Sequence, residues 1–85
     1  MKLTYLSHSC FLFETGTHRL IFDPFLSGNP LAKTKPEEIE CDAILVTHGH
    51  EDHLGDAVAI SKRTGAPVIA NFETAMHCSR QGATA

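Results

Sequence analysis

The sequence is poor in positive charge: seven lysine and arginine residues face ten aspartate and glutamate residues, for a formal net charge of −3. Proteins that bind a nucleic-acid backbone usually carry a basic patch or stripe, so no nucleic-acid partner is expected. No apolar run approaches the roughly 18 residues of a membrane-spanning helix, and no membrane association is expected either. The segment MKLTYLSH reaches Thr4 before an apolar run can form, which is not typical of a signal peptide.

Cysteine is scarce as well. Cys10, Cys41 and Cys78 are far apart in the sequence, and none belongs to a C-x-x-C pair. Because their number is odd, we interpret them as free, buried thiols in a reducing compartment, which predicts a soluble cytoplasmic protein. The 85 residues allow one small domain with a modest core.

Three short segments near the N-terminus are rich in β-forming residues, and we expect them to pair as an antiparallel meander. They are KLTYLS, CFLFET and HRLIFD. Gly16, between the last two, can adopt the positive φ of a hairpin turn. A loop with several prolines and glycines follows from Asp23 to Cys41, with room for one helical turn at KPEEIE.

After this loop the pattern alternates between strands and helices. AILV (residues 43–46) and PVIA (67–70) are apolar runs typical of strands covered on both faces. GDAVAISKRTG (55–65) and NFETAMHCSRQG (71–82) have helical start and stop signals, with Asn71 as an N-cap. The whole pattern predicts an α/β fold. Because no strand follows the last helix, we expect an open sheet edge at PVIA, as in part of a larger fold.

The segment VTHGHEDHLGD (46–56) concentrates three of the six histidines directly after a predicted buried strand. His48 and His50 are two residues apart, so in extended backbone their side chains point the same way. Asp52 and His53 lie where the chain turns into the next helix, from which they can face the same pocket. Imidazole and carboxylate are the ligands that catalytic zinc prefers.

Four such ligands within six residues favour two divalent metal ions, because one tetrahedral ion would struggle to take all four from so short a segment. Two ions about 3.5–4 Å apart can divide them and activate a bridging water. We expect two zinc ions, with manganese or iron as alternatives. The competing interpretation is that the histidines are solvated and the aspartate is only an N-cap, but the position between a buried strand and a helix favours the metal site.

The H-x-H-x-D-H pattern resembles the signature of the metallo-β-lactamase superfamily. LSHSCFLFET, LIFDPFLSGNP, KPEEIE and DAILVTHGHEDHLGDA resemble, in this order, predicted metal-dependent hydrolases related to the ascorbate-6-phosphate lactonases. The resemblance implies that His48 and His50 bind a first metal, that Asp52 and His53 bind a second, and that Asp23 supports the metal loop. It also implies the N-terminal half (residues 1–85) of a four-layer αββα sandwich, with the remaining ligands in a second half absent from this chain.

We therefore predict the N-terminal, metal-binding half of a hydrolase in which a metal-activated hydroxide attacks an ester, lactone, amide or phosphoester bond of a small molecule. Asp52 is expected to be catalytic as well as metal-binding. Two alternatives stay open. The chain acts only when a second copy or a separate second-half chain completes the site, or it is an inactive metal-binding or structural fragment.

The other histidines carry weaker signals. His8 lies in a predicted turn, and the resemblance places it near the metal site, where a substrate contact and a solvated turn residue are equally good interpretations. His18 is expected at a hairpin tip with no functional role. His77 is interpreted as a partly exposed helical residue rather than a metal ligand.

Overall fold

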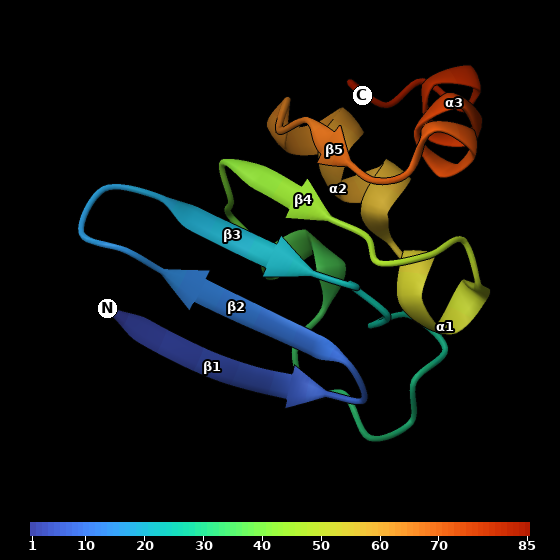
Figure 1. Ribbon diagram of the computed structural model, residues 1–85. Coiled ribbons are helices and arrows are strands. Elements are labelled where there is room, and N and C mark those ends of the chain that lie inside the picture. Colours follow the sequence, from blue (N-terminus) through green and yellow to red (C-terminus); the bar gives the residue numbers. More distant parts are fainter.

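The computed structural model describes residues 1–85 as a five-stranded sheet with helices packed against it (Figure 1). Each strand pairs with the strand that follows it in the chain. The strands are β1 (Lys2–Ser7), β2 (Cys10–Glu14), β3 (Arg19–Phe22), β4 (Ala43–Leu45) and β5 (Val68–Ile69). The helical segments are the 3-10 turn η1 (Pro36–Glu38) and the helices α1 (Glu51–Leu54), α2 (Ala57–Thr64) and α3 (Phe72–Arg80). The predicted α/β class, a meander followed by alternating strands and helices, is confirmed. No helix combines the length and apolar character that crossing a bilayer requires.

The strand directions bring the functional segments together. β1, β2 and β3 pair antiparallel, whereas β3, β4 and β5 pair parallel. The carboxyl ends of β3 and β4 therefore lie at the same end of the sheet. The turn between β1 and β2 also lies at that end, because β1 runs in the same direction as β3.

The hairpin between β2 and β3 is closed by a backbone hydrogen bond together with the Thr15 side chain. The Thr15 amide donates to the His18 carbonyl at 2.8 Å, and the Thr15 hydroxyl accepts from the His18 amide at 2.9 Å. Gly16 is not among the residues with positive φ. The prediction that its conformational freedom makes the turn was wrong, because the threonine hydroxyl supplies the hydrogen bonds that hold this loop.

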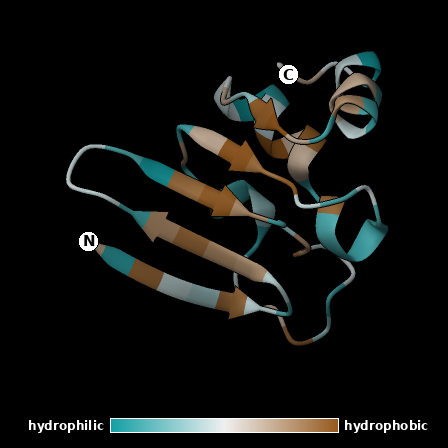
Figure 2. Ribbon diagram, in the orientation of Figure 1, coloured by the Kyte–Doolittle hydropathy of each residue, from teal (hydrophilic) through white to brown (hydrophobic).

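The two faces of the sheet have different surroundings. Ile21 and Ile44 are fully buried and pack in one core cluster with Ile60 of α2. We call this the covered face; Figure 1 shows η1 and α2 behind the sheet. On the opposite face, four apolar side chains line an open hollow of about 530 Å³: Leu3, Phe11, Phe13 and Phe22. We call these residues the open face. In Figure 2 hydrophobic residues fill most of β2, β3 and β4, whereas α1 is mostly hydrophilic.

The edge of β5 is not left fully open. The Val68 amide donates to the Thr84 carbonyl at 2.7 Å, so the last residues return to this strand. The buried Ser61 hydroxyl fixes the return, since it accepts from the Thr84 amide at 3.0 Å and donates to the Ala66 carbonyl at 2.7 Å. The expectation of an unpaired edge was therefore wrong at Val68. The strand is also not buried on both faces, because 54% of Ile69 is exposed.

The predicted helix at 55–65 is preceded by a separate helical turn. α1 begins after His50 and ends at Gly55, so Asp52 and His53 lie on their own short helix rather than at the start of α2. Gly55 has φ +45°, and a Cβ there would lie 2.4 Å from the Pro24 carbonyl oxygen. Only glycine fits this approach of two backbones. Nearby, the Asp56 carboxylate accepts from two amides of the loop after β3 at 3.1 and 2.7 Å.

Other terminal signals are where the sequence predicts them. Asn71 accepts the Thr74 amide at 2.9 Å as the N-cap of α3, and Gly65 ends α2 in the left-handed conformation. All three cysteines are free as predicted, and Cys10 and Cys78 are fully buried, but the expected burial of Cys41 was wrong because it is only partly buried. Burial, followed by the charges of two nearby aspartates, raises the pKa of the Cys10 thiol to about 12. Cys10 is therefore a protonated core residue at neutral pH.

Candidate metal centre

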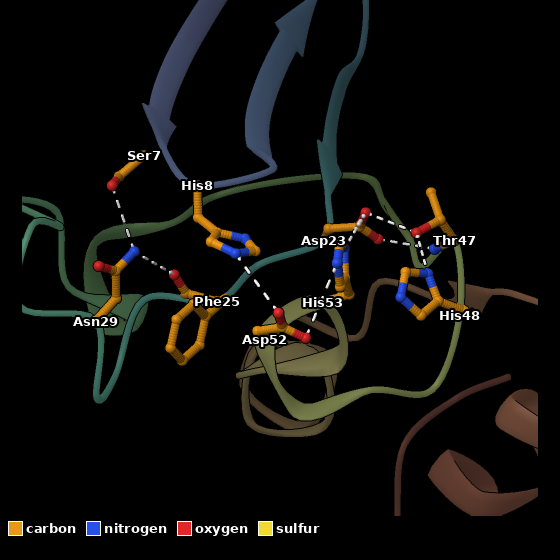
Figure 3. Close-up of polar contacts among 9 residues, drawn as sticks. All are labelled: Ser7, His8, Asp23, Phe25, Asn29, Thr47, His48, Asp52 and His53. Carbon is orange, nitrogen blue, oxygen red and sulfur yellow. Dashed lines mark hydrogen bonds and ion pairs between the residues drawn. The ribbon is translucent and has the colours of Figure 1, made fainter.

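Three segments converge at the end of the sheet (Figure 3). The turn between β1 and β2 supplies His8, the residue directly after β3 is Asp23, and the segment from the end of β4 through α1 supplies the predicted metal ligands. This convergence follows from the strand directions, because each segment leaves or joins a strand at the same end.

Asp23 is the buried hub of the site. Its side chain is 4% exposed and accepts three hydrogen bonds. Oδ1 accepts from the Thr47 amide at 2.7 Å, and Oδ2 accepts from the Thr47 hydroxyl at 2.8 Å and from Nδ1 of His53 at 3.0 Å. Its φ of +45° is unusual for a residue with a side chain, which shows that surrounding contacts determine this backbone. Because both of its oxygens already accept hydrogen bonds, Asp23 holds Thr47 and His53 in place and is not itself free to bind a metal.

These hydrogen bonds fix the orientation of two imidazoles. A carboxylate only accepts, so Nδ1 of His53 carries the proton that it shares with Asp23, and Nε2 is left for a metal. The Thr47 hydroxyl uses its one proton on Asp23, so it accepts from Nδ1 of His48 at 2.9 Å. Nε2 of His48 is then also free. Asp23 and Thr47 together prepare both histidines as Nε2 ligands.

The four predicted ligands lie close together. The ring centroids of His48 and His53 are 4.0 Å apart, and those of His48 and His50 are 4.6 Å apart. Oδ1 of Asp52 lies 3.8 Å from Nε2 of His53. The rings of His48, His50 and His53 are therefore neighbours, but His48 and His50 do not belong to a group of three or more donor atoms within 4.8 Å of one another, and His50 is exposed at the N-cap of α1.

His8 belongs to the site, a position that the residue pattern by itself left open. Its Nε2 lies 3.5 Å from Oδ2 of Asp52, and His8, Asp52 and His53 each offer a donor atom within 4.8 Å of the other two. Figure 3 shows His8 above Asp52 on the side of the site opposite Thr47. His18 and His77 do not belong to this donor group; they lie at the β2–β3 hairpin and on α3.

The donor set fits a divalent cation. Zinc binds imidazole nitrogen and carboxylate oxygen at about 2.0–2.2 Å, so neighbouring donors in a tetrahedral shell lie roughly 3.3–3.6 Å apart. The observed separations of 3.5 and 3.8 Å are close to this range. The side chain of Asp52 is 50% exposed and that of His8 is 39% exposed, so an ion and a small molecule can approach from solvent.

Comparisons with known proteins show the family of this chain. Residues 3–83 match the family described as the metallo-beta-lactamase superfamily. A UPF0173 metal-dependent hydrolase of Pelotomaculum thermopropionicum is 54% identical over 83 residues, covering 98% of this chain and 36% of that protein. A protein of the same name from Carboxydothermus hydrogenoformans is 57% identical over 81 residues, covering 95% of this chain and 36% of the relative.

A solved structure has the same fold. Igni18, described as a novel metallo hydrolase from the hyperthermophilic archaeon Ignicoccus hospitalis, superimposes with a TM-score of 0.85 and 37% sequence identity over 96% of this chain and 36% of that one. The chain thus spans about a third of the length of the relatives that it matches, and its fold is that of an N-terminal half, as expected. The sequence match, the sheet and the histidine cluster lead to one conclusion: this chain belongs to the metallo-β-lactamase superfamily.

Proposed function

We propose that residues 1–85 are the N-terminal, metal-binding half of a metal-dependent hydrolase. The observation that supports this most is the convergence of oriented imidazoles and a carboxylate at one end of the sheet. His48 and His50 hold one divalent cation and Asp52 and His53 hold a second, both zinc, with manganese or iron as alternatives. The relatives' description as metal-dependent hydrolases supports the reaction class.

The chain's own residues orient and hold the reacting groups. A bound divalent metal lowers the pKa of a coordinated water toward neutrality and polarises the bond under attack. Asp23 and Thr47 hold the imidazoles of His53 and His48 with Nε2 free. We assign the catalytic role to Asp52, because its side chain is 50% exposed and a carboxylate can accept a proton.

The substrate is a small molecule with an ester, lactone, amide or phosphoester bond. The open face argues for a further partner in the active form, since its apolar side chains run up to Asp23 and Thr47 beside the site. We propose that a complementary second half, or a second copy of the chain, covers this face and completes the ligand set. The free cysteines support a cytoplasmic location.

Metal content and hydrolysis are the direct tests. Protein purified without chelator at about pH 7.5, above the usual imidazole pKa of about 6.5, should retain zinc, manganese or iron. His53→Ala should lose it, and His18→Ala, at the distant hairpin, should retain it. Hydrolysis of generic esters, lactones and phosphodiesters should require the complementary half. Absence of metal in the unsubstituted protein would contradict the proposal.

The second candidate is an inactive metal-binding or structural fragment. It is favoured by the coverage, because the matched relatives are almost three times as long. It predicts weak metal binding and no hydrolysis even when the complementary half is supplied, which separates it from the first candidate.

A further inference from the structure

We infer that His8 is a metal ligand, and that the first divalent cation taken up by this chain is held by His8, Asp52 and His53. The inference rests on the proposed function, because it concerns the same metal centre. It differs in assigning the first ion to the β1–β2 turn and α1 rather than to His48 and His50.

The donor positions carry the inference. Among all 85 residues, the group of three or more histidine, cysteine or acidic side chains whose donor atoms lie close enough to share an ion is His8, Asp52 and His53, within 4.8 Å of one another. Nε2 of His8 and Nε2 of His53 lie on either side of the Asp52 carboxylate, 3.5 Å from Oδ2 and 3.8 Å from Oδ1. A small contraction brings these distances to those of a tetrahedral shell.

The backbone holds His8 at this position. Ser7 has φ +113° and His8 has φ +54°, and the pairing register of β1 shifts between Tyr5 and Ser7. Left-handed conformations are uncommon for such residues and persist where surrounding contacts determine them. Two contacts are present here: the side-chain Nδ2 of Asn29 donates to the Ser7 hydroxyl at 3.4 Å, and the His8 ring meets Phe25 edge-on at 5.6 Å between centroids.

His48 and His50 have a weaker claim to the first ion. Their rings are nearly perpendicular, at 84°, and no third donor of the chain completes a group with both of them. Thr47 orients His48. A cation at His48 and His50 would still need further ligands from outside this chain. The chain by itself therefore offers three donors at one position and two at the other.

A simple ion pair between His8 and Asp52 does not account for these observations. Both side chains are substantially exposed, at 39% and 50%, and exposed pairs of this kind contribute little to stability. Such a pair also leaves the third donor unexplained, because Nε2 of His53 lies 3.8 Å from the other oxygen of the same carboxylate.

The test is stepwise addition of Zn²⁺ to the chain, followed through the imidazole nitrogen signals in NMR spectra. The first equivalent should shift the Nε2 signals of His8 and His53 and leave those of His48 and His50 almost unchanged. Shifts of His48 and His50 at the first equivalent, with His8 unchanged, would overturn the inference. No shift and no bound zinc would instead contradict the proposed function, so the two failures are distinguishable.

Variants give an independent measurement. His8→Asn removes the imidazole and keeps a residue that tolerates positive φ, so the turn is preserved. It should weaken the first zinc affinity at least tenfold, whereas His48→Asn should change it less than threefold, and His18→Asn is the matched control. A larger loss in His48→Asn than in His8→Asn would overturn the inference. Backbone amide spectra of each variant check that the fold is retained.

Discussion

The covered and open faces of the sheet consist of similar residues in different surroundings. Ile21 and Ile44 on the covered face are fully buried beneath helices, whereas Phe11, Phe13 and Phe22 on the open face border an unfilled hollow. The proposed metal centre lies at the ends of β3 and β4, and two of the residues that orient it, Asp23 and Thr47, also border the hollow on the open face. The covered face stabilises the chain, and the open face is available to a partner.

The largest expected effect is on the covered face. Ile44→Ala removes a fully buried side chain and leaves a cavity, so the free energy of unfolding should fall by about 2–5 kcal/mol. Urea unfolding followed by circular dichroism measures this loss. Phe13→Ala, on the open face, is the matched control, and an equal loss there would mean that the faces do not differ in packing.

The second prediction concerns Asp23, which lies at the end of β3 between the open face and the proposed metal centre. Asp23→Ala leaves the Thr47 amide, the Thr47 hydroxyl and Nδ1 of His53 without their acceptor. Zinc affinity should fall about 10–100-fold, since outer partners orient metal-binding imidazoles. Calorimetry of zinc binding measures it, with Asp42→Ala, a distant exposed aspartate, as control. Unchanged affinity would mean that Asp23 does not orient the site.

The third prediction tests burial beneath the covered face through pH. The Cys10 pKa of about 12 lies above the ordinary value of 9.0, so the folded state keeps a proton that the unfolded chain loses. Stability from this group is therefore complete below pH 9 and falls as pH rises toward 12. The slope should be about 1.4 kcal/mol per pH unit at most. Urea unfolding at pH 8 and 10 measures it, and Cys10→Ala should lose that part of the slope.

The smallest effect on stability is expected on the open face. Phe13→Ser places a polar group at a position that is only partly exposed, so the free energy of unfolding should fall by about 2 kcal/mol or less, which is less than in Ile44→Ala. Self-association should decrease, because an open apolar surface favours contact between copies. Sedimentation velocity at several concentrations measures this. Unchanged association in Phe13→Ser would indicate that copies meet elsewhere.

Local patterns in the sequence predict the meander, the order of later elements, the Asn71 cap and the Gly65 stop, because each depends on residues close in the chain. Such patterns do not predict α1, because a helix of four residues is too short to show a helical periodicity. The return of Thr84 to β5 depends on Ser61, a residue on another element.

The candidate site follows the same division. The ligands from His48 to His53 are consecutive enough for spacing to indicate them. His8 reaches Asp52 only because the sheet folds the β1–β2 turn beside α1. The geometry at Thr47, which hydrogen-bonds both Asp23 and His48, likewise requires the parallel pairing of β3 and β4.

The close approach of Gly55 to Pro24 has a consequence for the ligands. Even one methyl group at position 55 would act as a wedge, since it would meet the backbone of the neighbouring loop at 2.4 Å. The loop and α1 would have to separate, and Asp52 and His53, carried on that helix, would be displaced with it. The absence of a side chain at position 55 thus helps to set where the proposed metal ligands Asp52 and His53 lie.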